Sequence, residues 1–296
     1  KEGFYLTMVR KSSSQIKGDP GVIFLTAVLI LSCLVFMALK VRCDQISRSR
    51  VPGSAIIYLP SGKYLKYVTF GYSSVLADLI YLWAIQYYSN YAIPDRFQYL
   101  EHIFSIISEL DPRYVDPYEL GALIAVYEGN NLELGLRILD MGLEKNPDQW
   151  FFPFLAGHLA QLRKNYELAR AYYKKAMDIP GSPEIVKRLY AFSAFKTMDL
   201  ETAWRTWLEI YETTKDERVK KIASNHLYQV KAAIDKQIIE RAISFFREKY
   251  GRNPYSLEQL KRTGFLKEIP KDLDGLDYLY DPATGEVRAA QIWWKR

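Results

Sequence analysis

The sequence predicts a mainly α-helical protein with three parts: an N-terminal transmembrane helix, a solenoid of stacked helix pairs, and a small α+β tail. Three observations predict this organisation. An uncharged run of 19 residues lies near the N-terminus, a short pattern returns every 34 residues in the middle of the chain, and turn residues join two strand-like segments near the C-terminus. At 296 residues and 49% hydrophobic, the chain can bury one sizeable core or two modest ones.

The uncharged run extends from Gly21 to Leu39. As a helix rising about 1.5 Å per residue, it roughly matches the hydrocarbon core of a bilayer. We therefore predict a transmembrane anchor at residues 21–40, after an N-terminal tail at residues 1–20. A cleaved signal peptide is less suitable, because its apolar stretch is shorter and this run ends in Lys40 and Arg42. A buried soluble helix is the other alternative, which the length and uniformity of the run disfavour.

The net charge of +6 belongs mainly to this N-terminal segment. Residues 1–51 carry eight basic and three acidic side chains, whereas the rest of the chain carries 32 and 31. Because phosphate binding needs a basic face on the folded domain, we expect no nucleic-acid partner. Basic residues flank the apolar run on both sides, so the positive-inside rule does not settle the orientation. The short N-terminal tail is the easier end to leave in the cytoplasm.

Residues 41–68 are rich in Pro, Gly and Ser around positions 52–62, and we interpret them as a linker. An aromatic segment follows at residues 72–91, with apolar side chains at helical spacing. A second membrane span is possible here by composition, but Asp78 and Gln86 within the segment favour a buried helix of a soluble domain. The spaced apolar residues are Leu76, Leu79, Ile80, Trp83 and Tyr87.

A short pattern recurs in the middle of the chain as NNLELG, KNYELA and MDLETA, which end 34 residues apart at Gly135, Ala169 and Ala203. Bulky residues follow four positions later, and mostly small residues three positions after those. This arrangement places small side chains where two helices approach closely. The second residue of each recurring string is suited to an N-cap, and a glutamate follows in the first turn. The N-cap candidates are Asn131, Asn165 and Asp199, and the glutamates are Glu133, Glu167 and Glu201.

A period of 34 residues in this register resembles the tetratricopeptide repeat (TPR), which has two antiparallel helices per unit. We predict about three clear TPR repeats at residues 113–234 and a degenerate first repeat at residues 69–112. The third unit departs from the pattern, because Ile210 replaces a small residue and no proline ends it. The alternative is an irregular helical bundle with an accidental period.

Stacked helix pairs of this kind form a concave groove lined by the first helix of each pair. The groove positions in this sequence are mostly apolar and aromatic, which suits an extended peptide or a partner helix. Alternatively, the terminal segments of the chain itself cover these side chains, since large exposed apolar patches are uncommon on monomers. The predicted groove residues are Leu120, Ile124, Tyr127, Phe151, Phe154, His158, Gln161, Arg188, Phe192 and Phe195.

The tail at residues 235–296 begins with an amphipathic helix and continues with a short helix after Ser256 and two strands around the turn DPATG. Its spacing of proline, leucine, glycine, aspartate and tyrosine resembles the tail that follows the long helix of pseudopilins. The residues of this pattern are Pro254, Leu257, Leu260, Gly264, Pro270, Asp272, Gly275, Tyr278 and Gly285.

From about Leu59 to Val287 the chain resembles bacterial membrane-anchored TPR proteins. The resemblance lies in LPSGK at 59–63, FGYSSVLADLIYLWAIQYY at 70–88, LDPRY at 110–114, NPDQWFFPFLAGH at 146–158, and the tail. It implies a single-pass protein of the bacterial inner membrane with a periplasmic body. It also implies a scaffold or adaptor that binds a protein or peptide, in the assembly of an envelope machine such as a pilus or secretion system. A permanent structural subunit of a membrane complex is the alternative.

An enzyme is the least favoured class. The three histidines are 56 and 68 positions apart, no metal-ligand spacing occurs, and no glycine-rich phosphate loop is present. Cys33 and Cys43 lie in or beside the apolar run, so they form no disulfide framework. We expect Asp272 and Asp274 to cap a loop and not to form a cation site. We expect His158 to be a hydrogen-bonded residue of the groove lining and not a catalytic one. We therefore predict no catalytic residue, no metal and no cofactor.

Overall fold

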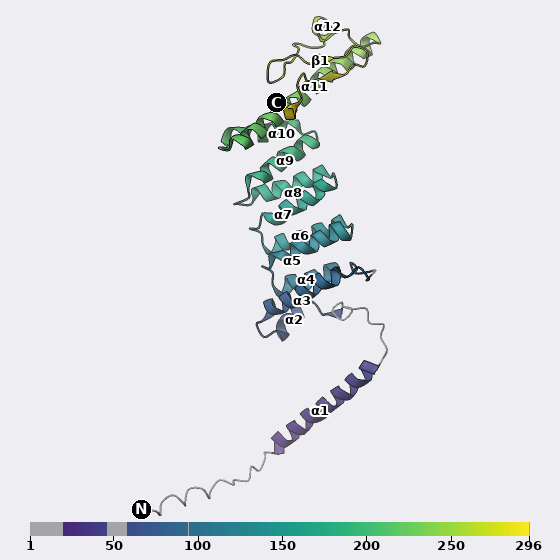
Figure 1. Cartoon of the computed structure of the whole chain (residues 1–296), viewed down its shortest axis with the longest axis vertical. Coiled ribbons are helices and arrows are strands. Elements are labelled where there is room, and N and C mark those ends of the chain that lie inside the picture. Colours follow the sequence, from purple (N-terminus) through teal and green to yellow (C-terminus); the bar gives the residue numbers. More distant parts are fainter. Residues whose placement is uncertain (1–19, 46–57, 94, 296) are drawn as a thin grey trace, which may run out of the picture. The chain divides into compact units, whose positions relative to one another are not determined.

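The computed structural model describes residues 20–45, 58–93 and 95–295 (Figure 1). The predicted N-terminal tail, up to residue 19, and residues 46–57 of the predicted linker lie outside the described residues. The described chain is mainly helical and divides into two compact units, residues 1–54 and 55–296.

The first unit contains helix α1, Pro20–Gln45. The most apolar 18-residue window within Gly21–Gln45 has a mean hydropathy of 2.9, and none of this window is buried against other parts of the protein. By length and composition this helix can span a membrane. It continues five residues beyond the predicted anchor, through Arg42 to Gln45.

The second unit begins with two helices that both pack on a third. Residues 62–68, which the sequence analysis placed in the linker, form a helix instead. It lies tightly on α4, because a Cβ atom on Gly62 would come within 2.6 Å of Glu109 Cβ. The three helices are α2 (Gly62–Val68), α3 (Ser73–Tyr88) and α4 (Leu100–Leu110).

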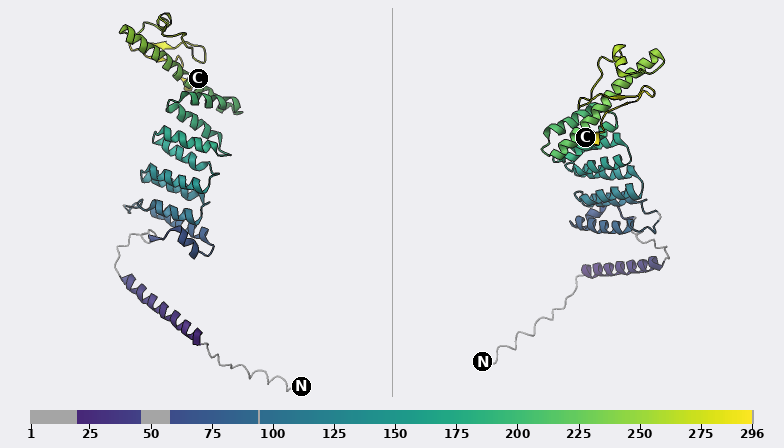
Figure 2. Two further views of the ribbon diagram at one scale, coloured as in Figure 1. Left: turned by 180° about the vertical axis from the view of Figure 1, so that it is seen from behind. Right: turned by 45° about the horizontal axis from the view of Figure 1, so that its top comes forward.

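The middle of the unit is a succession of helices in which each packs on the next along the chain, as Figures 1 and 2 show. Small residues lie at the close approaches, as predicted. A Cβ atom on Gly135 would be 2.5 Å from Val126 Cγ2, and one on Gly157 would be 2.8 Å from the ring of Tyr173. The elements are α5 (Val115–Leu123), the π-helical turn η2 (Ile124–Glu128), α6 (Leu132–Lys145), α7 (Phe151–Leu162), α8 (Tyr166–Asp178), α9 (Glu184–Lys196) and α10 (Leu200–Thr213).

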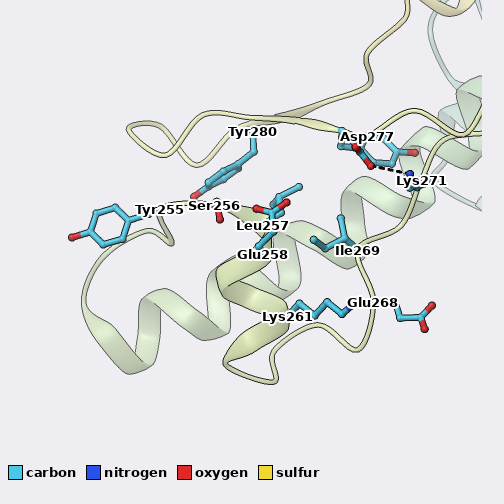
Figure 3. A pocket seen from close by; sticks show the side chains of 11 residues that line it. Tyr255, Ser256, Leu257, Glu258, Lys261, Glu268, Ile269, Lys271, Asp277 and Tyr280 are labelled. Carbon is cyan, nitrogen blue, oxygen red and sulfur yellow. Dashed lines mark ion pairs between the residues drawn. The ribbon is translucent and has the colours of Figure 1, made fainter.

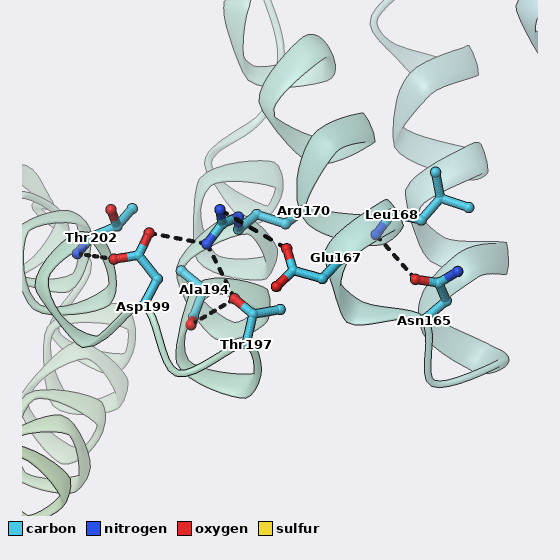
Figure 4. A network of polar contacts seen from close by, with 8 residues as sticks. All are labelled: Asn165, Glu167, Leu168, Arg170, Ala194, Thr197, Asp199 and Thr202. Atoms are coloured by element: carbon cyan, nitrogen blue, oxygen red, sulfur yellow. Dashed lines mark hydrogen bonds and ion pairs between the residues drawn. The ribbon is translucent and has the colours of Figure 1, made fainter. Parts of the chain in front are cut away.

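The predicted N-caps are confirmed. The side chains of Asn131, Asn165 and Asp199 accept hydrogen bonds from backbone N–H groups three residues later, at 3.0, 3.2 and 3.1 Å. Asp199 also accepts a bond of 3.0 Å from Arg170 of α8, which donates to Thr197 as well (Figure 4). Burial opposes ionisation of Asp199, but hydrogen bonds from Thr202 and Arg170 lower its pKa. Arg170 thus connects the second helix of one pair to the cap of the next second helix.

The C-terminal part is built on one long helix, α11 (Glu217–Tyr250), which runs without interruption across the boundary predicted at residue 235. Gly251 ends it in the left-handed conformation, with a φ of 69°. The elements after it are α12 (Leu257–Arg262), strands β1 (Leu279–Tyr280) and β2 (Val287–Arg288), and the 3₁₀ turn η3 (Trp293–Lys295). β1 and β2 pair antiparallel at the place where the sequence predicts two strands and a turn. Ile239, Ile243 and Phe246 of α11 form a core with Leu260 and Val287.

Candidate protein-binding surface

The ten predicted groove residues all lie on first helices, or on the π turn that extends one of them. Leu120 is on α5, and Ile124 and Tyr127 are on η2. α7 carries four of the residues and α9 three. Their exposure differs greatly from one end of the row to the other, so the row is not one uniform surface.

At the N-terminal end of the row, little apolar surface is accessible. Ile124 is 7% exposed, and Leu120 is half-buried against the same core. Tyr127 is 61% exposed and projects from the π turn. Only Tyr127 is therefore free for a partner in this region.

The α7 residues form a row of ring contacts. Phe154 packs against Phe151, against Tyr173 of α8, and against His158, with ring centroids 6.2, 6.4 and 6.5 Å apart. His158 thus lies against an aromatic ring, and the described residues provide no hydrogen bond to its imidazole. All three groove residues of this row are half-buried. Much of their ring surface is therefore already used inside the protein.

Three of the predicted residues come together at a cavity of about 270 Å³ between α7, α9, α10 and α11. They are Gln161, Arg188 and Phe192, and the predicted row leads directly to this cavity. The remaining lining residues are Ile185, Leu189, Trp207, Ile222 and His226. Phe195, one turn beyond Phe192, is not at the cavity, because it packs on the core formed by α9, α10 and α11.

Two donors at the cavity have no hydrogen-bond partner among the described residues: Nε of Arg188 and Nε1 of Trp207, both of which are buried. The previous repeat shows why Trp207 lacks one. There Tyr173, 34 residues earlier, donates to Gln161 Oε1 at 3.0 Å. The position equivalent to Gln161 in the next unit is Phe195, which offers no acceptor. Buried polar groups are normally satisfied, so these two donors are exceptions that call for an acceptor.

The C-terminal segment borders this cavity. The imidazole of His226 stacks on Trp207 with centroids 4.2 Å apart, and Trp293 of η3 packs at 4.9 Å from the same imidazole. Burial lowers the pKa of His226, while a hydrogen bond with Gln229 acts in the opposite direction. The chain's own terminal segment therefore packs on His226 at the edge of the cavity.

Five lining residues of the cavity were not predicted from the sequence, although the sequence contains a signal for three of them. Ile222 and His226 lie 34 residues after Arg188 and Phe192. Extending the period by one more unit, onto the first half of α11, would have included them. Ile185 likewise lies 34 residues after the predicted residue Phe151. Trp207 and Leu189 lack such a signal, because Trp207 belongs to a second helix and Leu189 lies between the predicted positions Arg188 and Phe192.

A second cavity, of about 400 Å³, lies in the tail between α12 and the chain near β1 (Figure 3). Lys271 and Asp277 form an ion pair of 3.5 Å at its edge. Its charged side chains are exposed and of both signs, so it favours no single ligand charge. The described residues contain no group of three or more His, Cys, Asp or Glu side chains placed to hold a metal ion.

The expected loop cap in the tail is confirmed. Asp272 Oδ1 accepts backbone hydrogen bonds from Asp274 at 3.0 Å and from Leu276 at 2.8 Å. These bonds shape the turn at Gly275, whose φ is 78°. The carboxylate of Asp272 is therefore used to hold its own loop.

Comparison of the chain with protein-family models and with curated proteins gave no match in either case.

Proposed function

We propose that this chain is a single-pass protein of the bacterial inner membrane, with a TPR-type helical solenoid and a small α+β tail in the periplasm. Its groove binds a protein partner, as a peptide or a helix, and so holds that partner at the membrane. α1 supports the anchor by its length and apolar composition. The 34-residue period with caps and small residues at equivalent places supports the TPR assignment.

The cavity between α7, α9, α10 and α11 is the observation that carries this proposal. Its volume of about 270 Å³ lies below the range of about 300–1,000 Å³ that is typical of small-molecule sites. It is large enough for one aliphatic or aromatic side chain. Apolar walls from Ile185, Leu189, Phe192 and Ile222 favour such a side chain over a polar cofactor.

The unpartnered donors of Arg188 and Trp207 indicate which group of the partner lies beside the apolar side chain in the cavity. A buried donor without an acceptor costs about 1–3 kcal/mol, so a partner that supplies the acceptor recovers part of this free energy on binding. Arg188 is charged and makes no ion pair with any described residue. We therefore expect a partner segment with an apolar anchor beside a carboxylate or a backbone carbonyl.

Site-specific photo-crosslinking of the full-length protein in its native membrane tests this proposal. A photoreactive phenylalanine analogue replaces Phe192, which lines the cavity. The control carries the same analogue at Phe195, on the same helix but packed into a core. We expect a discrete crosslinked partner from position 192 and none from position 195.

The variant Arg188→Met keeps the side-chain stem and removes the guanidinium. In this background the adduct at position 192 should decrease severalfold while helix content and melting stay unchanged. Equal adducts at both positions, or an adduct that does not depend on Arg188, would contradict binding at the cavity.

A further inference from the structure

Helix α3 is apolar on two opposite faces. One face, including Ala77, Ile80 and Ala84, is buried in the core of the unit. Val75, Leu79 and Leu82 follow the helical spacing on the other face and are 54%, 60% and 56% exposed. A helix that is apolar all round is normally covered on all sides. The predicted buried helix is thus correct for one face only.

The preceding helix and turn carry further exposed apolar side chains. Tyr67 and Phe70 are 82% and 88% exposed, more than almost any other large apolar side chain of the unit. Contiguous exposed apolar surface on a soluble body usually marks an interaction site. We call it the α2–α3 surface, and it consists of Tyr64, Tyr67, Val68, Phe70, Tyr72, Val75, Leu79 and Leu82.

The charges around the α2–α3 surface are positive. Lys63 and Lys66 lie on α2 and are exposed. Asp78 is the single acidic residue in the sequence from 58 to 93, and its carboxylate hydrogen-bonds Tyr114, a residue of the next repeat. The surface therefore presents aromatic and aliphatic side chains with lysines. The Glu109 carboxylate of α4, at the start of α2, accepts a hydrogen bond of 2.9 Å from the Lys63 N–H.

We propose that the α2–α3 surface lies in the headgroup region of the bilayer that α1 spans. Tyrosine is enriched at membrane interfaces because its ring has an apolar body and a polar end. Lysine keeps its stem on apolar surface while its ammonium group reaches anionic headgroups. Both residue types are present here, whereas a helix buried in the hydrocarbon core would need neither.

The length of chain between α1 and the surface fits this contact. Twelve residues separate Gln45 from Tyr58, and a fully extended chain spans at most about 3.6 Å per residue. A segment of this length allows the second unit to reach the membrane surface without fixing how the two units are placed. This second membrane contact is separate from the groove and depends only on the anchor part of the proposed function.

Spin labels on the full-length protein in nanodiscs that contain anionic lipid test this contact. In a background with Cys33→Ser and Cys43→Ser, single labels replace Tyr67, Phe70 or Leu79. Leu162→Cys is the matched control, because Leu162 is also apolar and 51% exposed but lies on α7. Power saturation compares access of oxygen, which concentrates in lipid, with access of a water-soluble nickel chelate.

We expect an oxygen-to-nickel access ratio severalfold higher at the three surface positions than at Leu162. Equal ratios would show that the surface lies in water and would overturn the proposal. Protection from both reagents would also overturn it: with dipolar broadening between labels it indicates a second copy, and without broadening a different protein. A label at Leu29 in the middle of α1 separates these outcomes from failure of the anchor. It reports lipid in each of the outcomes above and reports water if α1 does not span the membrane.

Discussion

The helix pairs from α5 to α10 and the tail on α11 bury side chains of different chemistry. Between the pairs, the fully buried contacts are mainly apolar: Phe152 is fully buried with its ring 5.4 Å from that of Tyr118. In the tail, two buried carboxylates accept tyrosine hydroxyls. Tyr228 donates to Asp272 and Tyr278 to Asp235, each at 2.7 Å.

The difference reflects how much apolar surface each region can bury. A repeated pair packs on neighbours at both sides, so non-directional contacts supply most of its burial. The tail has only a small core on one half of α11, and directional bonds fix its position. Burial, followed by the bond to Asp272, raises the pKa of Tyr228 to about 12, so this hydroxyl keeps its proton in neutral solution.

The largest loss in the free energy of unfolding should come from a substitution in the apolar contacts between the helix pairs. Phe152→Ala removes a fully buried ring from the contact between α7 and α5, and we expect a loss of about 3–5 kcal/mol in the free energy of unfolding. Chemical denaturation of the detergent-solubilised full chain, followed by circular dichroism, measures it. Phe151→Ala is the control, since that ring is half-buried, and it should cost clearly less. A similar loss for both would contradict the assignment of the core.

Removal of a buried carboxylate should have a smaller and more local effect. Asp235→Ala leaves the Tyr278 hydroxyl and the Lys231 ammonium without their partner. Because Lys231 remains partly exposed, we expect a loss of about 2–3 kcal/mol, below the usual value for a fully buried pair.

Hydrogen–deuterium exchange locates this loss. Protection should fall in residues 264–289 and stay unchanged in α7 and α8. Asp235→Asn keeps an acceptor for Tyr278 and should lose less protection than Asp235→Ala. Uniform loss along the whole body would mean that the tail and the repeats unfold as one unit.

The sequence specified the repeated region well because its determinants are local. An N-cap such as Asn131 and a small residue such as Gly135 act within one or two turns, and the period shows them three times. α2 was missed because a short helix between Gly and Pro residues has no amphipathic pattern long enough to detect. Its stability comes from contact with α4, which is distant in sequence.

The candidate site was less predictable, because it depends on small rotations of side chains around a helix. Phe192 and Phe195 both fit the groove face by spacing, yet one lines the cavity and the other packs in a core. The Trp207 Nε1–H has no acceptor among the described residues because Phe195 stands where the preceding unit has the amide oxygen of Gln161. Only the folded arrangement reveals this unpartnered donor. The period itself, extended by one unit, would have added His226.

The smallest loss in the free energy of unfolding should come from the contact between Arg170 and Asp199, which joins two helix pairs. Asp199→Ala removes both an N-cap and the ion pair with Arg170, whereas Asn165→Ala removes a cap alone. Loss of a cap costs about 0.5–2 kcal/mol. We expect Asp199→Ala to cost a few tenths of a kcal/mol more than Asn165→Ala, because the ion pair is partly exposed and such pairs contribute little.

The pH dependence of the stability of Asp199→Asn separates the contribution of the Asp199 charge from that of the N-cap hydrogen bond. The pKa of Asp199 is lowered from its usual 3.8, so its carboxylate contributes stability above that value and loses it as the pH falls through the folded pKa. Asn at this position keeps a cap but carries no charge. The wild-type protein should therefore be slightly more stable than Asp199→Asn at neutral pH, and the difference should vanish in strong acid. A difference that persists in acid would assign the effect to the geometry of the cap, because protonation would already have removed the ion pair with Arg170.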